Sequence, residues 1–210
     1  GSIVLIGGSD IFGRQSDVWR SEDQGATWTE MTSSAIAGGR ESHTSVVLPD
    51  GSIVFMGGTS GSSRSNGVWR SEDQGATWTQ LSGTRWEGRT GHTSVVLPDG
   101  SIVLMGGSTL SLKDDVWRSI DQGASWTQIK ASAEWPARTE HTSVVLPDGS
   151  IVLMGGTSAS LRNDAWRMET ASSADQIPAH TYTEAGTYDV ALQSYNAEGF
   201  GNIQKAEYIE

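Results

Sequence analysis

The sequence predicts an all-β fold, a β-propeller of four-stranded antiparallel blades, and three observations lead to this prediction. The stretch HTSVVLPDGSIV occupies residues 43–54 and returns unchanged at 92–103 and 141–152. The motif GSIV begins at residues 1, 51, 100 and 149, which gives a period close to 50 residues. Every unit consists of short β-type runs divided by turn residues. A small antiparallel sheet cannot bury both faces alone, so neighbouring units must stack as propeller blades do.

The elements of one unit follow in a fixed order. HTSVV is a first strand, LPDG makes a tight turn, and SIVLMGG is a second strand that ends in paired glycines. A loop of about eight residues leads to a third strand around DVWRS, which is followed by a turn at DQGA and a fourth strand at TWTQ. The tryptophans of the third strands, Trp19, Trp69, Trp117 and Trp166, are therefore expected at equivalent sites.

The count of strands leaves the ring incomplete. The first unit lacks its first strand and the fourth lacks its last, so about fourteen propeller strands are expected, or 3.5 to 4 blades. Propellers have about 4 to 8 blades. Three arrangements stay open: a four-bladed ring sealed by the C-terminal tail, a half-ring completed by a second chain, or an excerpt of a longer array. We favour assembly with another chain or with further sequence.

The antiparallel meander separates the repeated turns from the divergent segments. The LPDG and DQGA turns share one end of every blade, and the connections between second and third strands share the opposite end with the segments between blades. These divergent segments are residues 9–16, 59–66, 108–114 and 157–163, and residues 33–39, 82–88 and 130–137. A rigid scaffold with one variable face is a common way to build a binding surface. Gene duplication followed by loop drift is the competing interpretation.

Composition excludes several classes of function. The 210 residues carry a net charge of −11 with only 14 lysines and arginines, which argues against nucleic acid or an anionic membrane as partner. There is no cysteine, so disulfides and thiolate chemistry are excluded while the redox compartment stays undecided. No apolar run approaches the roughly 20 residues that span a bilayer. Because the first residue already lies inside a repeat and no signal segment precedes it, we expect an excerpt or a processed chain.

Three turn segments carry a resemblance to known families. SEDQGATWT at 21–29 and 71–79 and SIDQGASWT at 119–127 resemble the Asp box, or BNR repeat, of sialidase-type propellers. The order of Arg, His, Gly-Gly and Asp-Val-Trp within each unit also resembles the kelch repeat. The resemblance implies a structural role at the turn between third and fourth strands for Asp23, Gly25, Trp28, Asp73, Gly75, Trp78, Asp121, Gly123 and Trp126.

The chemistry of these turns favours a structural role over a metal site. Each aspartate is expected to accept hydrogen bonds from backbone N–H groups of its own turn, and each tryptophan to pack between blades. A calcium loop is the alternative, but it needs several oxygen ligands at alternating positions and each box supplies one carboxylate. We therefore predict no metal and no cofactor.

Arginine and histidine recur at one position of each repeat. Arg40, Arg89 and Arg138 each stand three residues before a histidine, at the start of a first strand. A repeated packing or hydrogen-bonding role is one interpretation. A candidate ligand face is the other: it would hold these arginines, which resemble the carboxylate-binding cluster of sialidases, together with Trp86 and Trp135 of the segments between blades.

Catalytic constellations are missing from the repeats. A sialidase needs a Tyr–Glu pair, yet all four tyrosines, Tyr182, Tyr188, Tyr195 and Tyr208, follow the propeller units. Kelch-type copper oxidases need a Cys-linked tyrosine, which this chain cannot form. No Ser/His/Asp set or paired carboxylates stand out either.

The C-terminal segment departs from the repeat. HTYTEAGTYDVALQSYNAEGFGNIQKAEYIE resembles the second half of a PKD domain, an immunoglobulin-like sandwich of extracellular surface proteins. The predicted division is propeller repeats at 1–168, a linker at 169–179 and a partial PKD-like segment at 180–210. Half a sandwich cannot bury its own core, so we expect its strands to pair with an open blade edge or a neighbouring chain.

The sequence thus predicts a non-catalytic extracellular or cell-surface propeller. It would mediate binding, adhesion or surface assembly through the variable loops, with a protein or glycan ligand and with self-association or completion by further sequence. This interpretation includes neither nucleic acid nor membrane insertion. A sialidase-like glycoside hydrolase or a carbohydrate-binding propeller is the alternative, because fold alone does not determine function.

Overall fold

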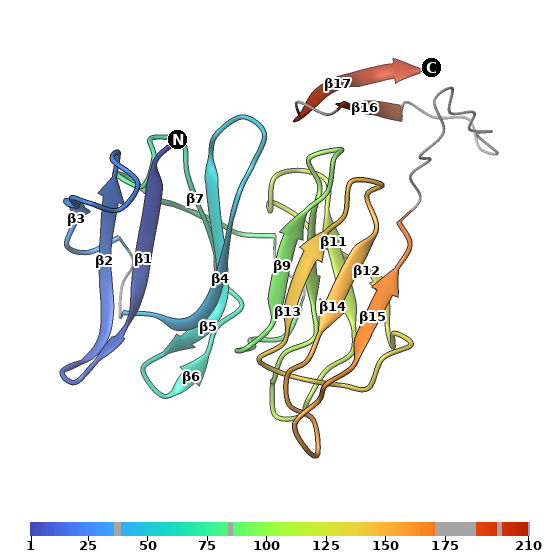
Figure 1. The fold of residues 1–210 in the computed structure, drawn as a ribbon. Coiled ribbons are helices and arrows are strands. Elements are labelled where there is room, and N and C mark those ends of the chain that lie inside the picture. The colour runs from blue at the N-terminus through green and yellow to red at the C-terminus, as the bar shows by residue number, and fades with distance from the viewer. Residues whose placement is uncertain (36–38, 84–85, 171–187, 197–198, 210) are drawn as a thin grey trace.

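Four antiparallel sheets follow one another along the chain in the computed structural model (Figure 1). The structure describes residues 1–35, 39–83, 86–170, 188–196 and 199–209. Each sheet is one repeat unit, and we name them blade 1 to blade 4 in chain order. The described residues form strands, turns and bends, which confirms the all-β propeller fold predicted from the repeats.

The strands follow the predicted order in each unit, but strand residues extend into two of the predicted loops, residues 9–16 in blade 1 and 59–66 in blade 2. Blade 1 contains β1 (Ile3–Asp10), β2 (Gly13–Ser21) and β3 (Thr29–Thr32). Blade 2 contains β4 (Glu41–Val47), β5 (Ile53–Ser60), β6 (Ser63–Arg64), β7 (Val68–Ser71) and β8 (Thr79–Leu81). Blade 3 contains β9 (Thr93–Val96), β10 (Ile102–Met105), β11 (Val116–Ser119) and β12 (Thr127–Lys130). Blade 4 contains β13 (Thr142–Val145), β14 (Ile151–Met154) and β15 (Ala165–Met168).

The identical hairpins adopt identical registers. Val96 pairs with Ile102 in blade 3 and Val145 pairs with Ile151 in blade 4. In the LPDG turn of blade 2, the Gly51 N–H donates to the Leu48 carbonyl at 2.9 Å. The four third-strand tryptophans are register equivalents, because each pairs with the third residue of its second-strand IVxx run: Leu5↔Trp19, Phe55↔Trp69, Leu104↔Trp117 and Leu153↔Trp166. Their predicted equivalence is confirmed.

The core consists of three apolar layers, one between each pair of neighbouring blades. Ile53 and Phe55 of β5 pack with Ile6 and Val18 of blade 1. The alternate β5 residues point the other way, into a cluster with Ile102 and Leu104 of β10. Val103 and Met105 of β10 in turn pack with Ile151 and Leu153 of β14. The two faces of a strand alternate with period two, so the second strand of a middle blade is buried on both faces.

The outer faces of the end blades are more open than the faces between blades. Ile3 and Leu5 of β1 are 45 % and 48 % exposed, and Val144 of β13 is 44 % exposed. In contrast, all four residues of β10 are fully buried. The four blades therefore form a stack with an apolar surface left at each end. Neighbouring blades contact each other in chain order, β1 with β4, β4 with β9 and β9 with β13.

The C-terminal strands form a separate two-stranded sheet. β16 (Tyr188–Asn196) pairs antiparallel with β17 (Gly199–Ile209). Within the described ranges, neither strand is hydrogen-bonded to a blade, so the expected pairing of the tail with an open blade edge is not found there. The predicted linker and the start of the PKD-like segment, residues 171–187, lie outside the described residues.

Paired glycines end the regular part of the second strand in blades 2 and 3: the first glycine lies against the start of the next blade, and the second lies against the start of the first strand of its own blade. Gly57 and Gly58 have φ of 70° and 83°, and Gly106 and Gly107 have φ of 59° and 91°. A Cβ at Gly58 would lie 2.5 Å from the Glu41 carbonyl oxygen and 2.8 Å from the Cβ of His43. Glycine is thus required twice over, by the left-handed backbone and by the lack of space.

Gly58→Ala is expected to destabilise the fold by more than about 4 kcal/mol, because backbone atoms that cannot move aside meet the new methyl group. The matched control is Gly51→Ala: Gly51 has φ of 84°, but a Cβ there meets nothing within 4 Å. Strain alone should cost about 1 to 2 kcal/mol at Gly51. Urea unfolding measures both. Equal losses of unfolding free energy in Gly58→Ala and Gly51→Ala would contradict the close approach of β4 and β5 at Gly58.

Candidate functional site

The divergent segments lie together at one end of the stack, which we call the loop face. It comprises the described parts of residues 9–16, 59–66, 108–114 and 157–163, and of 33–39, 82–88 and 130–137. Backbone hydrogen bonds tie each connection to the following segment between blades: Ala35 N–H donates to Ser16, and Ala133 N–H donates to Asp114. In Figure 1 these connections are at the lower edge, and the β4–β5 turn is at the upper edge. The predicted separation of variable and repeated ends is present.

The repeated arginine links two blades beneath this face. The Arg89 N–H donates to the Ser65 carbonyl, and its own carbonyl accepts the Gly58 N–H, so the backbone at the start of blade 3 is hydrogen-bonded to blade 2. Its side chain reaches into blade 3, where Nη1 donates to the Gly106 carbonyl at 2.9 Å. Arg138 repeats the pattern with Gly155 at 2.8 Å. Each arginine therefore fastens the start of one blade to the blade before it.

A third-strand aspartate neutralises each of these two arginines. Arg89 donates from Nη1 and Nη2 to the two oxygens of Asp115, at 2.6 and 2.9 Å. The same two-bond pair joins Arg138 and Asp164, again at 2.6 and 2.9 Å. Burial works to raise the pKa of Asp115, but the bonds from Arg89 and Trp117 outweigh it and the pKa is lowered. A buried charge is tolerated when it is paired and hydrogen-bonded in this way.

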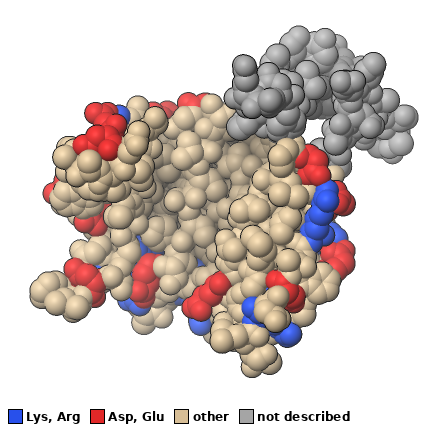
Figure 2. Space-filling view, in the orientation of Figure 1, with Lys and Arg blue, Asp and Glu red and all other residues tan. Residues whose placement is uncertain are grey.

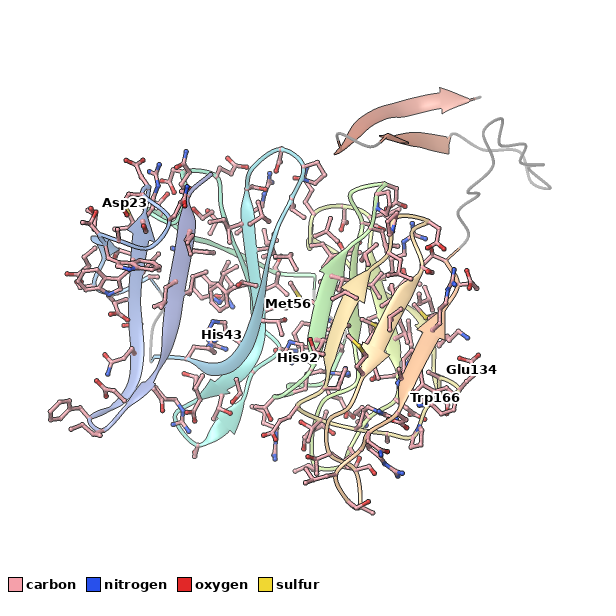
Figure 3. All side chains as sticks on the ribbon, in the orientation of Figure 1. Asp23, His43, Met56, His92, Glu134 and Trp166 are labelled. Atoms are coloured by element: carbon pink, nitrogen blue, oxygen red, sulfur yellow. The ribbon has the colours of Figure 1, made fainter. Side chains whose placement is uncertain are left out.

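The repeated histidines fill the same layer between blades. His92 Nε2 lies 3.1 Å from Thr44 Oγ1 of the previous blade, and His141 Nε2 lies 2.9 Å from Thr93 Oγ1. Figure 3 places His43 between blades 1 and 2 and His92 between blades 2 and 3. Burial, followed by the charge of the neighbouring arginine, lowers the pKa of His92 to about 3 and of His43 and His141 to about 4. The imidazoles are therefore neutral at pH 7.

The candidate ligand-face side chains are interior groups, which corrects their expected exposure. Arg40, Arg89, Arg138, Trp86 and Trp135 are all buried, at 5 % exposure or less. Trp86 meets Trp126 edge to face at 6.0 Å between ring centroids, and the Arg89 guanidinium lies 5.8 Å from its ring. Trp135 belongs to the core between blades 3 and 4. Because Arg89 and Arg138 each serve the carboxylate of their own blade, they do not converge on a shared ligand.

The three aspartate turns have one geometry. Asp73 Oδ1 accepts the Thr77 N–H at 2.8 Å and the Ser71 hydroxyl at 2.8 Å, and Oδ2 accepts the Thr77 hydroxyl. Asp23 and Asp121 make the same three bonds. The hydrogen bonds from the Thr27 hydroxyl and N–H lower the pKa of Asp23 to about 2. The carboxylates thus close their own turns, as a structural role requires.

The glycine and tryptophan of each turn complete this geometry. Gly25, Gly75 and Gly123 have φ between 93° and 97°, and each accepts the indole N–H of its tryptophan at 3.0 Å. Trp126 is buried between blades and Trp78 packs against the core of blades 1 and 2, whereas Trp28 is 39 % exposed. Trp28 belongs to the end blade, whose outer side is open.

The part of the chain that the structure describes contains no group of three or more His, Cys, Asp or Glu side chains placed to hold a metal ion. No helix in these ranges is long and apolar enough to cross a membrane.

Apolar side chains stand out from the tips of the loop face. Ile11 and Phe12 of blade 1 are 92 % and 88 % exposed, Leu161 of blade 4 is 85 % exposed, and Leu110 of blade 3 is fully exposed. Ion pairs lie beside them, Arg14 with Glu41 and Lys113 with Glu87. Sequence reasoning took these segments as variable loops but singled out none of the apolar residues, because only the structure shows that their side chains leave the core.

Four-stranded antiparallel blades, stacked face to face and closed by paired glycines, define a β-propeller of the kelch type. The chain belongs to the kelch-repeat family: the family model described as the KLHDC2/KLHL20/DRC7 Kelch-repeats domain matches residues 1–156. A search of curated proteins returned no match. Kelch-repeat domains are typically non-enzymatic modules that bind proteins.

The neutral buried histidines predict a loss of stability in mild acid. Their folded pKa values, about 3 to 4, lie below the ordinary 6.5, so the unfolded chain takes up protons first as pH falls. Stability is then complete above pH 6.5 and declines towards pH 4. His92→Gln should reduce the fall in Tm between pH 7 and 4.5. A wild-type Tm that is flat over this range, or an unchanged slope in the variant, would contradict the assignment.

Proposed function

We propose that this chain is a non-catalytic binding propeller that holds a protein partner on its loop face. The observation that carries the proposal is the set of apolar tips, Ile11, Phe12, Leu110 and Leu161, which protrude from three blades at the same end of the stack. Exposed apolar groups rimmed by polar ones are typical of interaction sites. Figure 2 shows acidic and basic side chains interspersed along this lower edge, with uncharged atoms at the outermost tips.

The scaffold beneath the tips supports this function. The arginine, histidine and glycine contacts hold the start of each loop by the same bonds in neighbouring blades, while the loop sequences differ. A rigid framework lets variable tips bind without a large loss of conformational entropy.

Two narrower elements of the proposal come from the resemblances. We propose that the turns at 21–29, 71–79 and 119–127 are Asp boxes. This assignment is supported by the aspartate of each turn, which accepts a backbone N–H of the same turn. We also propose an extracellular or cell-surface location with a role in adhesion or surface assembly, which the PKD-like segment at 180–210 supports.

The loop face can be tested with ligands selected from a displayed peptide library. Replacing Phe12 and Leu110 together by serine should weaken binding of the selected peptides at least about tenfold, because buried apolar anchors dominate such interfaces. The control is Ile120→Ser, which removes a side chain 79 % exposed on the opposite end of blade 3. The proposal would be contradicted if the selected peptides bound the double variant as tightly as the wild type, or if Ile120→Ser weakened their binding equally.

We also propose that the stack associates with a second copy through its end blades. The observation is the apolar outer face of blade 1, where Ile3 and Leu5 are about half exposed although the equivalent Ile102 and Leu104 are fully buried. Covering this face against another blade would bury the same side chains as in the middle of the stack.

Analytical ultracentrifugation tests the association. The wild-type chain should sediment as a concentration-dependent oligomer, and Leu5→Glu should shift it towards the monomer, since a buried charge is costly. Leu161→Glu, on the loop face, should leave the association unchanged. A wild-type chain that stays monomeric at the highest concentration would contradict the proposal.

A further inference from the structure

The second blade departs from the repeat at the residue directly before its third strand. The position that holds Asp17, Asp115 and Asp164 in the other blades holds Gly67 in blade 2. Gly67 does not have a left-handed φ, so the backbone does not require a glycine there. The substitution therefore removes a carboxylate without a conformational reason.

In the complete blades that carboxylate has two kinds of donor. Asp115 accepts both bonds of the Arg89 guanidinium, and its Oδ2 also accepts the Trp117 indole N–H at 2.8 Å. Asp164 accepts from Arg138 and from Trp166, whose indole nitrogen lies 2.9 Å away. The carboxylate thus lies in a pocket of N–H groups formed by one arginine and one tryptophan.

Blade 2 keeps both donors and lacks the acceptor. Arg40 Nη1 donates to the Gly57 carbonyl at 3.2 Å, the same bond that Arg89 makes to Gly106, so the guanidinium lies at the equivalent place. Arg40 is 5 % exposed, and no carboxylate of the described residues pairs with it. The buried indole nitrogen of Trp69 has no hydrogen-bond partner in the same part of the chain.

The unpaired arginine is disfavoured as it stands. Burial lowers the pKa of Arg40, and the ring of Phe55, 6.0 Å from the guanidinium carbon, offers only a weak cation–π contact. A buried cation needs a paired anion and satisfied hydrogen bonds. The Nε atoms of Arg89 and Arg138 donate to carbonyls two residues earlier, but the counterpart for Arg40 is residue 38, which lies outside the described ranges.

Two polar atoms lie at the place of the missing aspartate side chain beside Gly67. The nearest atoms to a Cβ built there are Ser65 Oγ at 3.2 Å and Trp69 Nε1 at 3.3 Å, so the missing side chain would point at the unpartnered indole. Gly67 and Trp69 are half-buried, and Asn66 beside them is exposed, so the position lies close to the surface of the loop face.

We propose that blade 2 contains a binding site for a carboxylate of about the size of formate or acetate, held by Arg40 and Trp69 in place of the absent aspartate side chain. The planar guanidinium matches a carboxylate through two parallel hydrogen bonds, and the indole N–H supplies the third. The carboxylate comes from a free short-chain acid or from an acidic side chain of a bound protein. The site does not depend on the protein-binding function proposed above.

Thermal unfolding at constant ionic strength tests the site. Replacing sodium chloride by sodium acetate at a concentration tenfold above Kd should raise the wild-type Tm by about 3 to 6 °C. Gly67→Asp supplies the carboxylate within the chain, so this variant should melt higher than wild type in chloride and gain nothing from acetate. Gly67→Asn, which adds similar volume without the charge, should not reproduce that gain in stability.

Two further arms separate the alternatives. Asp115→Gly removes the equivalent carboxylate from blade 3, and acetate should restore part of the Tm that this variant loses. If the variant does not fold, the Gly67 variants still test the proposal. N-acetyl-aspartate amide should bind in calorimetry like acetate if the site accepts a protein side chain, and the asparagine analogue should not bind. Weaker binding of the aspartate compound than of acetate assigns the site to free acids. The proposal would be overturned if the Tm of the wild type were the same in acetate as in chloride, or if acetate raised the Tm of Gly67→Asp as much as that of the wild type.

Discussion

The close approach of neighbouring blades at the paired glycines is the constraint on which the rest of the structure depends. A Cβ at Gly106 would lie 3.0 Å from the His141 ring and 3.1 Å from the Arg138 carbonyl oxygen, both at the start of the next blade. At Gly107 a side chain would collide with the Thr90 carbonyl and His92 of its own blade, while its N–H donates to the Arg138 carbonyl at 2.9 Å. Its neighbour Gly106 accepts Arg89 through its carbonyl. One glycine pair therefore serves the arginine that starts its own blade and the arginine that starts the next. The histidine, the first strand and the apolar layer of each blade pack around this glycine pair.

This arrangement separates the residues that build the propeller from the residues that are free to bind. The network of arginine, aspartate, histidine and glycine lies in the interior, and the aspartate turns occupy the opposite end. The loop tips take part in neither, so Phe12 or Leu110 can change without disturbing a buried contact. Repetition thus gives stability through nearest-neighbour contacts, and divergence is confined to one surface.

The sequence predicted the strands, their order, the turns and the equivalence of the tryptophans, because hydrophobic alternation and turn chemistry are local properties. It did not predict that Arg89 pairs with Asp115, since 26 residues separate them and only the blade geometry brings them together. For the same reason Trp86 and Arg138 were candidates for a ligand face although they are buried. The glycine at position 67 was not singled out from the sequence, because its meaning depends on Arg40, which only the fold places beside it.

A carboxylate completes the arginine and tryptophan network in blades 3 and 4, and the chain supplies none at the equivalent position in blade 2. The most direct measurement is the ¹H–¹⁵N spectrum of the indole N–H groups in a carboxylate-free buffer, assigned by single Trp→Phe replacements. The indole protons of Trp117 and Trp166, which donate to charged oxygens, should resonate downfield of the Trp69 proton, which has no acceptor. A Trp69 proton as far downfield as the other two would contradict the account.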